Sequence, residues 1–173
     1  MVKKVKSISY ISILTALATG IYYVEAFLPM PIPVPGARWG FSNFPLILSV
    51  VSGVGLRNTL YIALLKTILG SLLSGRFLSP MFWMGLGGAI SSAITMFLAF
   101  KSTDKFGILG ISEIGAFFSN FIQLIIAALL IVKSWNIFWY FPYMLFFGII
   151  TAFINATITN YILRSVKLDK LKY

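Results

Sequence analysis

The sequence has no cysteine, no histidine and only four acidic residues among its 173 residues. Without cysteine the chain can form no disulfide and has no thiolate nucleophile or thiolate metal ligand. Without histidine it has no imidazole to act as a base or to bind a metal. The four acids are spread along the chain, so we expect no carboxylate pair for acid–base chemistry or for a magnesium-bound diphosphate. We therefore expect no enzyme: no catalytic residues, no metal and no cofactor.

Charged residues of all kinds are also scarce, at 10% of the chain, whereas hydrophobic residues make up 59%. Soluble domains contain about 45–50% apolar and about 25% charged residues. With a mean hydropathy of +0.94, the chain lacks the polar groups that a water-facing surface needs. These values predict an all-α, polytopic membrane helix bundle. The net charge of +10 does not indicate a nucleic-acid partner, because most basic residues lie between or outside the apolar runs.

Apolar runs separated by proline, glycine and charged residues predict about six transmembrane helices in a single domain over residues 1–173. Alternating prolines from Pro29 to Pro35 end the first run, because proline does not fit inside a helix. Five or seven spans are the alternatives, since the second and third runs can also form one long hairpin. The expected spans are 7–28, 39–54, 57–74, 81–100, 112–132 and 138–163.

The basic residues predict the orientation of these spans. An inside N-terminus places ten of them on the inner side: Lys3, Lys4, Lys6, Arg57, Lys101, Lys105, Arg164, Lys167, Lys170 and Lys172. Arg38, Arg76 and Lys133 then lie outside, and Lys66 falls within the third span. Because short cytoplasmic loops are enriched in lysine and arginine, we expect both termini in the cytoplasm.

Lys66 is the most informative single residue. It lies roughly 13 Å into the third span, near the bilayer centre. An ammonium group at that depth normally faces the protein interior or a water-filled cavity. Asn120 and Gln123 share one face of the fifth span at a similar depth. We expect these three polar side chains to converge near the midplane.

Two interpretations of this cluster remain open at the level of sequence. It is either a polar clamp that only stabilises the bundle or the lining of a ligand cavity, and an intramembrane charge favours the cavity. Glu25, near the outer end of the first span, is a candidate countercharge for Lys66, and Arg38 competes for it. The basic groups would suit an anionic solute, and the stiff proline-rich loop before Arg38 would suit an outer lid.

Small residues recur at four-residue spacing in two of the spans. Ser12, Ala16 and Gly20 form one such stripe in the first span. Gly85, Gly88 and Ser92 lie at similar spacing in the fourth. Such stripes let helix backbones approach closely in lipid. Packing within the bundle explains both, and docking to a second membrane protein is the alternative for the first.

An ordered set of motifs carries a resemblance to one bacterial family. The run from Glu25 through the prolines to Pro35-Gly36-Ala37-Arg38-Trp39-Gly40-Phe41-Ser42-Asn43 is similar to that family's signature, and Ser119-Asn120-Phe121-Ile122-Gln123 is similar to a second stretch of it. The chain is identified as a member of the heptaprenyl diphosphate synthase component I, or Gx transporter, family. It departs from the family pattern where Arg38 replaces a lysine, Trp39 a leucine and Ser119 a histidine.

That family resembles the substrate-binding S components of energy-coupling factor transporters. The resemblance implies a subunit of a bacterial plasma membrane importer that captures a small solute from outside. Its first helix, with Ser12, Ala16 and Gly20, would dock on a transmembrane coupling protein that carries two ATPases. The implied solute site is lined by Glu25, Arg38, Trp39, Asn43, Lys66, Asn120 and Gln123. The alternatives are an accessory membrane subunit of a polyprenyl diphosphate synthase and a purely structural or channel-like bundle.

Overall fold

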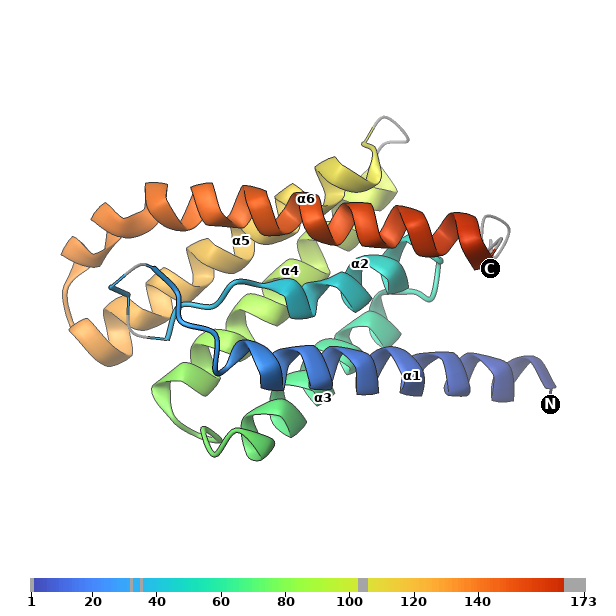
Figure 1. Cartoon of the computed structure of the whole chain (residues 1–173), viewed down its shortest axis with the longest axis horizontal. Helices are drawn as coiled ribbons and strands as arrows, with labels where there is room; N and C mark the ends of the chain where they lie inside the picture. The colour runs from blue at the N-terminus through green and yellow to red at the C-terminus, as the bar shows by residue number, and fades with distance from the viewer. Residues whose placement is uncertain (1, 32, 35, 103–105, 167–173) are drawn as a thin grey trace.

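The computed structural model describes residues 2–31, 33–34, 36–102 and 106–166. All the regular elements over these residues are helical, which confirms the predicted all-α fold class (Figure 1). The elements are α1 Val2–Glu25, η1 Phe41–Asn43, α2 Phe44–Val51, α3 Leu56–Leu73, α4 Pro80–Ser102, α5 Ile108–Ala127, η2 Ala128–Val132, η3 Trp135–Tyr140 and α6 Phe141–Val166.

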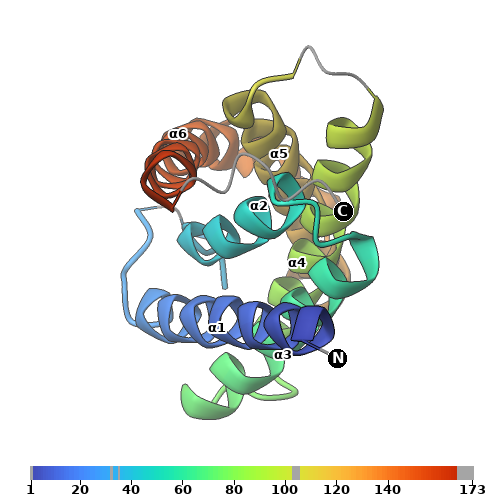
Figure 2. The same cartoon turned by 90° about the vertical axis from the view of Figure 1, so that its right-hand side faces the viewer.

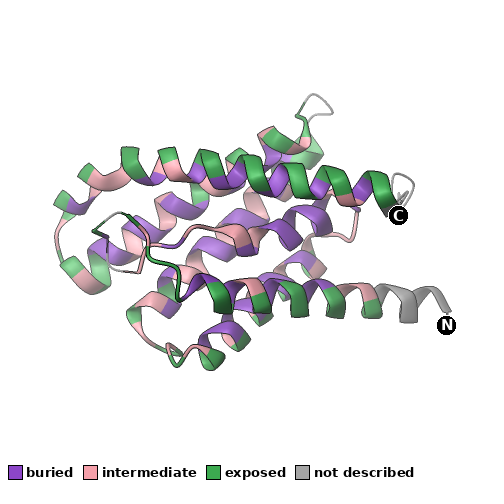
Figure 3. Ribbon diagram, viewed as in Figure 1, coloured by how far each residue is buried: buried purple, intermediate pink, exposed green. Residues whose placement is uncertain are grey.

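Five helical segments of the described residues are long and apolar enough to cross a membrane. These are α1, α3, α4, α5 continued by η2, and α6 preceded by η3. The exposed surface of the bundle fits this assignment, since large apolar side chains such as Ile13, Leu73 and Phe153 are exposed (Figure 3). A surface of this kind is suited to lipid rather than water.

The second of the six expected spans, here called the second crossing, is not among these five, because its apolar helix is shorter. Only residues 41–51 of the span expected over 39–54 are helical, as a short η1 followed by α2. Gly40, in the left-handed region at φ 93°, precedes the helical part, and Pro45 lies in the first turn of α2, a position where proline starts a helix well. The first part of this crossing is therefore non-helical chain.

α2 occupies the centre of the bundle. It packs against all five long helices, and the views in Figures 1 and 2 show it between α1 on one side and α5 and α6 on the other. Every residue from Phe44 to Val50 is buried. Protein rather than lipid therefore surrounds this element along its length.

The start of α1 and the end of α6 lie at the same end of the bundle (Figure 1). Both ends therefore belong on one side of a membrane. Lys105, Lys167, Lys170 and Lys172, which contribute to the charge bias, lie outside the described residues. The cytoplasmic orientation of the termini stays a prediction.

α5 begins at Ile108, four residues before the expected span. Ser112 consequently lies inside the helix and is buried. Its hydroxyl donates a 2.9 Å hydrogen bond to the Ala152 carbonyl of α6. This contact ties α5 to α6 at that level.

Glycines in α3 and α4 make room for the ring of Tyr22 from α1. A Cβ atom on Gly70 would lie 2.3 Å from Tyr22 Cδ1, and one on Gly85 would lie 2.5 Å from Tyr22 Oη. Gly88 makes the same kind of room for Ser119 and Gln123 of α5. Packing within the bundle therefore accounts for the small residues of α4.

Candidate functional site

Polar side chains from three helices bind the backbone at the broken second crossing. Lys66 Nζ of α3 donates to the Ser42 carbonyl at 2.8 Å. Glu25 Oε1 of α1 accepts the Phe41 amide hydrogen, and Asn155 Nδ2 of α6 donates to the Gly40 carbonyl at 3.0 Å. Non-helical backbone at membrane depth has lost its intrahelical partners and must find others. We call the three side chains of Glu25, Lys66 and Asn155 the backbone clamp.

Lys66 is turned inward, as the sequence predicts for an intramembrane ammonium. The side chain is 1% exposed, and it also donates to Asn43 Oδ1 at 2.7 Å. Ser42 Oγ lies 3.4 Å from the same nitrogen. The hydrogen-bond acceptors of the ammonium therefore all belong to Ser42 and Asn43 of the broken segment.

Arg38 lies on the α1 side of this segment. Its guanidinium carbon lies 3.9 Å from the centroid of the Tyr22 ring, in a cation–π contact. Glu25 interacts electrostatically with both Arg38 and Lys66. Among the described residues, the three guanidinium nitrogens, Tyr22 Oη and Glu25 Oε2 have no hydrogen-bond partner. The charged cluster therefore retains unused donors and acceptors.

A small polar cavity lies on the opposite side of the segment, toward α5 and α6. Its volume is about 10 Å³, which is enough for roughly one water molecule or one hydroxyl group. The lining comes from the broken crossing and from α2, α4, α5 and α6: Trp39, Gly40, Asn43, Ile47, Ser92, Met96, Ser112, Ala116, Ser119, Asn120, Gly148, Thr151 and Asn155. We call this space the central cavity.

Two polar atoms of residues that line the central cavity are unused. Ser92 Oγ and Asn155 Oδ1 are buried and have no hydrogen-bond partner within the described residues. Gln123 Oε1 is unpaired as well, and the Gln123 amide nitrogen donates to Ser119 Oγ at 3.1 Å. Buried polar atoms without partners are uncommon in folded proteins. Beside a cavity, such atoms are available to a ligand or to water.

The structure divides the site residues expected from sequence into two groups. Trp39, Asn43 and Asn120 line the central cavity, and Gln123 reaches it through Ser119. Glu25 and Arg38 belong to the charged cluster beside Tyr22. Lys66 meets the cavity only through Asn43, so the expected convergence of Lys66 with Asn120 and Gln123 is indirect.

Sequence reasoning did not select Tyr22, Ser92 or Asn155. Asn155 carried a usable signal, because an amide in the middle of an apolar span needs a partner. Tyr22 and Ser92 carried none, since single hydroxyls are common in such helices and their partners depend on how the helices pack.

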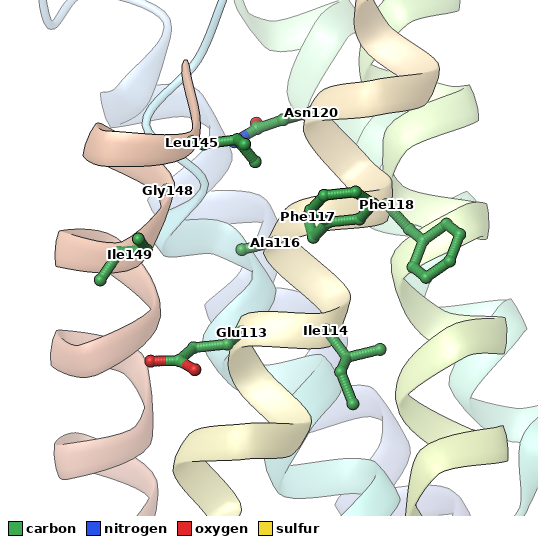
Figure 4. Close-up of a pocket in the computed structure, with 9 residues that line it drawn as sticks. All are labelled: Glu113, Ile114, Ala116, Phe117, Phe118, Asn120, Leu145, Gly148 and Ile149. Atoms are coloured by element: carbon green, nitrogen blue, oxygen red, sulfur yellow. The ribbon is translucent and has the colours of Figure 1, made fainter. Parts of the chain in front are cut away.

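A wider groove opens beside the central cavity, between α5 and α6 (Figure 4). Its volume is about 330 Å³, and it is lined by Glu113, Ile114, Ala116, Phe117, Phe118, Asn120, Leu145, Gly148 and Ile149. Ala116, Asn120 and Gly148 also line the central cavity. We call this space the lateral groove; the two spaces share one wall.

The stripe on α1 faces outward. Ser12, Ala16 and Gly20 are all exposed, and a Cβ atom on Gly20 would meet nothing within 4 Å. Ala16 and Gly20 line a shallow surface groove of about 590 Å³ that runs toward Leu28 and Phe41. Internal packing therefore does not account for this stripe, in contrast to the small residues of α4.

The apolar surface, the five long helices and the buried polar centre define a multi-pass membrane helix bundle. A family model described as heptaprenyl diphosphate synthase component I matches residues 14–162. Because the match covers most of the chain, the protein belongs to this family, as its motifs predicted. No curated protein and no solved structure matches the chain.

Proposed function

We propose that the protein is a non-enzymatic substrate-capture subunit of a membrane importer, of the S-component type. The observation that carries this proposal is the broken second crossing, which runs through the centre of the bundle beside a cavity with unused polar atoms. Secondary transporters bind their substrates at such discontinuous segments near the midplane, where helix ends and free backbone groups are available. A helix bundle that binds no ligand gains nothing comparable from a discontinuous segment at its centre.

Transport against a gradient requires an energy source that this chain does not carry. The sequence has no glycine-rich loop of the kind that cradles nucleotide phosphates. We therefore propose a separate module with a transmembrane coupling protein and two ATPase subunits. The exposed stripe of Ser12, Ala16 and Gly20 supports docking of a partner helix on α1, because small residues allow close backbone contact in lipid.

Affinity purification of the tagged protein from its native membrane tests this proposal. The expected result is a complex with one further membrane protein and two subunits that hydrolyse ATP. Ala16→Leu combined with Gly20→Leu should abolish the complex while the purified variant unfolds at an unchanged temperature, because both positions are exposed. Thr157→Leu is the matched control, since Thr157 is exposed on α6. Recovery of an intact complex with the double variant would contradict docking through α1.

The family description favours a second candidate function, an accessory membrane subunit of a polyprenyl diphosphate synthase. Within the described residues no cluster of acids could hold the magnesium of a diphosphate substrate, so in this role the chain would anchor or supply the catalytic subunit. Prenyl-transfer activity of a purified complex that depends on this chain, with no ATPase subunits present, would support this candidate over the first.

A further inference from the structure

The unused polar atoms of the central cavity suit a group that both donates and accepts hydrogen bonds, because Asn155 Oδ1 accepts and the Ser92 hydroxyl can do either. Asn155 Nδ2 is bound to the Gly40 carbonyl, which leaves Oδ1 as the free end of the amide. Ser92 Oγ, 0% exposed, is the other unused atom of the lining. Neither cation lines the cavity, since Lys66 is bound to the broken segment and Arg38 stacks on Tyr22. A buried carboxylate or phosphate would lie beside the acceptor Asn155 Oδ1 with no Lys or Arg in the lining, which is costly.

A cationic head group is equally unsuited to this cavity. None of the residues given for its lining is acidic, and the ammonium of Lys66 lies one residue away, on Asn43. The volume of about 10 Å³ admits only a group the size of a water molecule. A neutral hydroxyl group fits both the size of the cavity and its lack of charge. It can donate a hydrogen bond to Asn155 Oδ1 and either donate to or accept from the Ser92 hydroxyl.

The lateral groove has the size and the lining to hold an apolar chain attached to that hydroxyl. Apart from Glu113 and Asn120, its lining side chains are apolar, and Phe117, Phe118 and Ile149 are exposed at its surface. It follows α5 from Glu113 to Asn120, roughly 8 to 18 Å from the start of that helix. The groove therefore lies at a depth where the bundle faces hydrocarbon.

Asn120 is the polar residue among the three that line both the lateral groove and the central cavity. Asn120 reaches from α5 toward α6 (Figure 4) and donates to the Met144 carbonyl at 2.8 Å. It has room to do so only because residue 148 is glycine, whose Cβ would lie 2.6 Å from Asn120 Nδ2. Rotation of Asn120 would join the two spaces at the cost of a single hydrogen bond.

We propose that the ligand of the central cavity is a neutral amphiphile, a long-chain alcohol, that enters from the bilayer between α5 and α6. Its hydroxyl binds Asn155 and Ser92, its chain lies in the lateral groove, and Asn120 is the gate. This inference rests on the proposed substrate-capture function, for which it names the substrate class and the route of entry.

Photolabelling of the full chain in lipid nanodiscs tests the inference. The probes are hexadecanol, hexadecane and hexadecanoate, each with the same diazirine group on the chain. The alcohol should label peptides of α5 and α6 about tenfold more than the alkane or the carboxylate, and unlabelled hexadecanol should compete. Equal labelling by the alkane would show ordinary lipid contact, and preferential labelling by the carboxylate would show an anion site. Either result overturns the inference.

Two variants separate the head-group contact from the groove. Ser92→Ala removes an atom that no protein group uses, so it should weaken alcohol labelling about fivefold without loss of stability. Ile149→Trp fills the lateral groove and should abolish labelling. Leu129→Trp is its control, because Leu129 is similarly exposed and lines an apolar groove between α4 and α5. Unchanged labelling of Ser92→Ala or Ile149→Trp overturns the inference.

The outcome is independent of the test of the proposed function. Absence of alcohol-specific labelling, with the ATPase complex still recovered, would reject the alcohol and leave substrate capture intact. Alcohol-specific labelling without any ATPase complex would support the alcohol-binding site and contradict the proposed importer function.

Discussion

The ammonium of Lys66 and the side-chain oxygen of Asn43 lie 2.7 Å apart and form a hydrogen bond near the centre of the bundle. This bond connects α3 to the residue that precedes α2, while Lys66 also binds the Ser42 carbonyl. Asn43 in turn lines the central cavity. The same lysine therefore serves as a structural clamp and positions a cavity residue, so the two interpretations left open by the sequence are not exclusive.

Lys66→Met should lower the free energy of unfolding by about 1–3 kcal/mol, because the buried Ser42 carbonyl and Asn43 amide oxygen lose their donor. Thermal unfolding in detergent measures the change. Lys101→Met is the control, since Lys101 is exposed at the end of α4, and it should unfold as the wild type does. Wild-type stability of Lys66→Met would show that the cost of burying the ammonium cancels its hydrogen bonds.

Glu25 and Lys66 should be energetically coupled. Glu25→Gln keeps an acceptor for the Phe41 amide but removes the negative charge that acts on Lys66 and Arg38. We expect the single variant to be less stable than the wild type, because two buried cations lose the nearby acid that favours their charge. The double variant Glu25→Gln with Lys66→Met should lose less unfolding free energy than the sum of the two single-variant losses, by about 1 kcal/mol or more. Strictly additive unfolding energies would contradict the coupling.

The fold class could be predicted because it depends on quantities that are local in the sequence. Apolar runs and the breaks between them define spans, and spans in lipid must be helices. The inward direction of Lys66 follows from the same energetics. The second crossing could not be predicted in this way. An apolar run over 39–54 is compatible with a full helix, but the helical part begins only at Phe41. Side chains of other helices hold this start through hydrogen bonds to Gly40, Phe41 and Ser42.

The site could be predicted only in part, for a related reason. Depth along a helix placed Lys66, Asn120 and Gln123 at one level, but the direction of each side chain depends on the rotation of its helix against its neighbours. Asn120 turned toward the Met144 carbonyl and Gln123 toward Ser119. The pairing of Arg38 with Tyr22 crosses a loop of unpredictable path, so no periodicity in the sequence could have revealed it.

Gly85→Ala should be destabilising and should be rescued by Tyr22→Phe. The new methyl group would lie 2.5 Å from Tyr22 Oη but 3.4 Å from the nearest ring carbon, so removal of the hydroxyl relieves the worst contact. We expect a loss of about 1–3 kcal/mol for Gly85→Ala alone and near-wild-type stability for the double variant. Tyr22→Phe itself should be tolerated, because Tyr22 Oη has no hydrogen-bond partner in the described part of the protein.

Gly70→Ala is the matched case that Tyr22→Phe should not rescue. Its methyl group would lie 2.3 Å from Tyr22 Cδ1, an atom that phenylalanine retains. Gly20→Ala, which meets nothing within 4 Å, should be neutral or slightly stabilising. Thermal unfolding of the four single variants and of the two double variants in one detergent gives the comparison. Rescue of Gly70→Ala by Tyr22→Phe would show that the ring does not lie between α3 and α4 as described.

The absence of cysteine makes the orientation directly testable. Asn136→Cys and Ser102→Cys introduce single thiols at exposed positions near opposite ends of the bundle. If the termini are cytoplasmic, a membrane-impermeant maleimide should label Asn136→Cys in intact cells and Ser102→Cys only after permeabilisation. Neither substitution should affect folding, because neither residue is buried. The reverse pattern would place the proline-rich loop and the open end of α5 and α6 on the inner side, and an importer that captures its solute from outside would then be wrong.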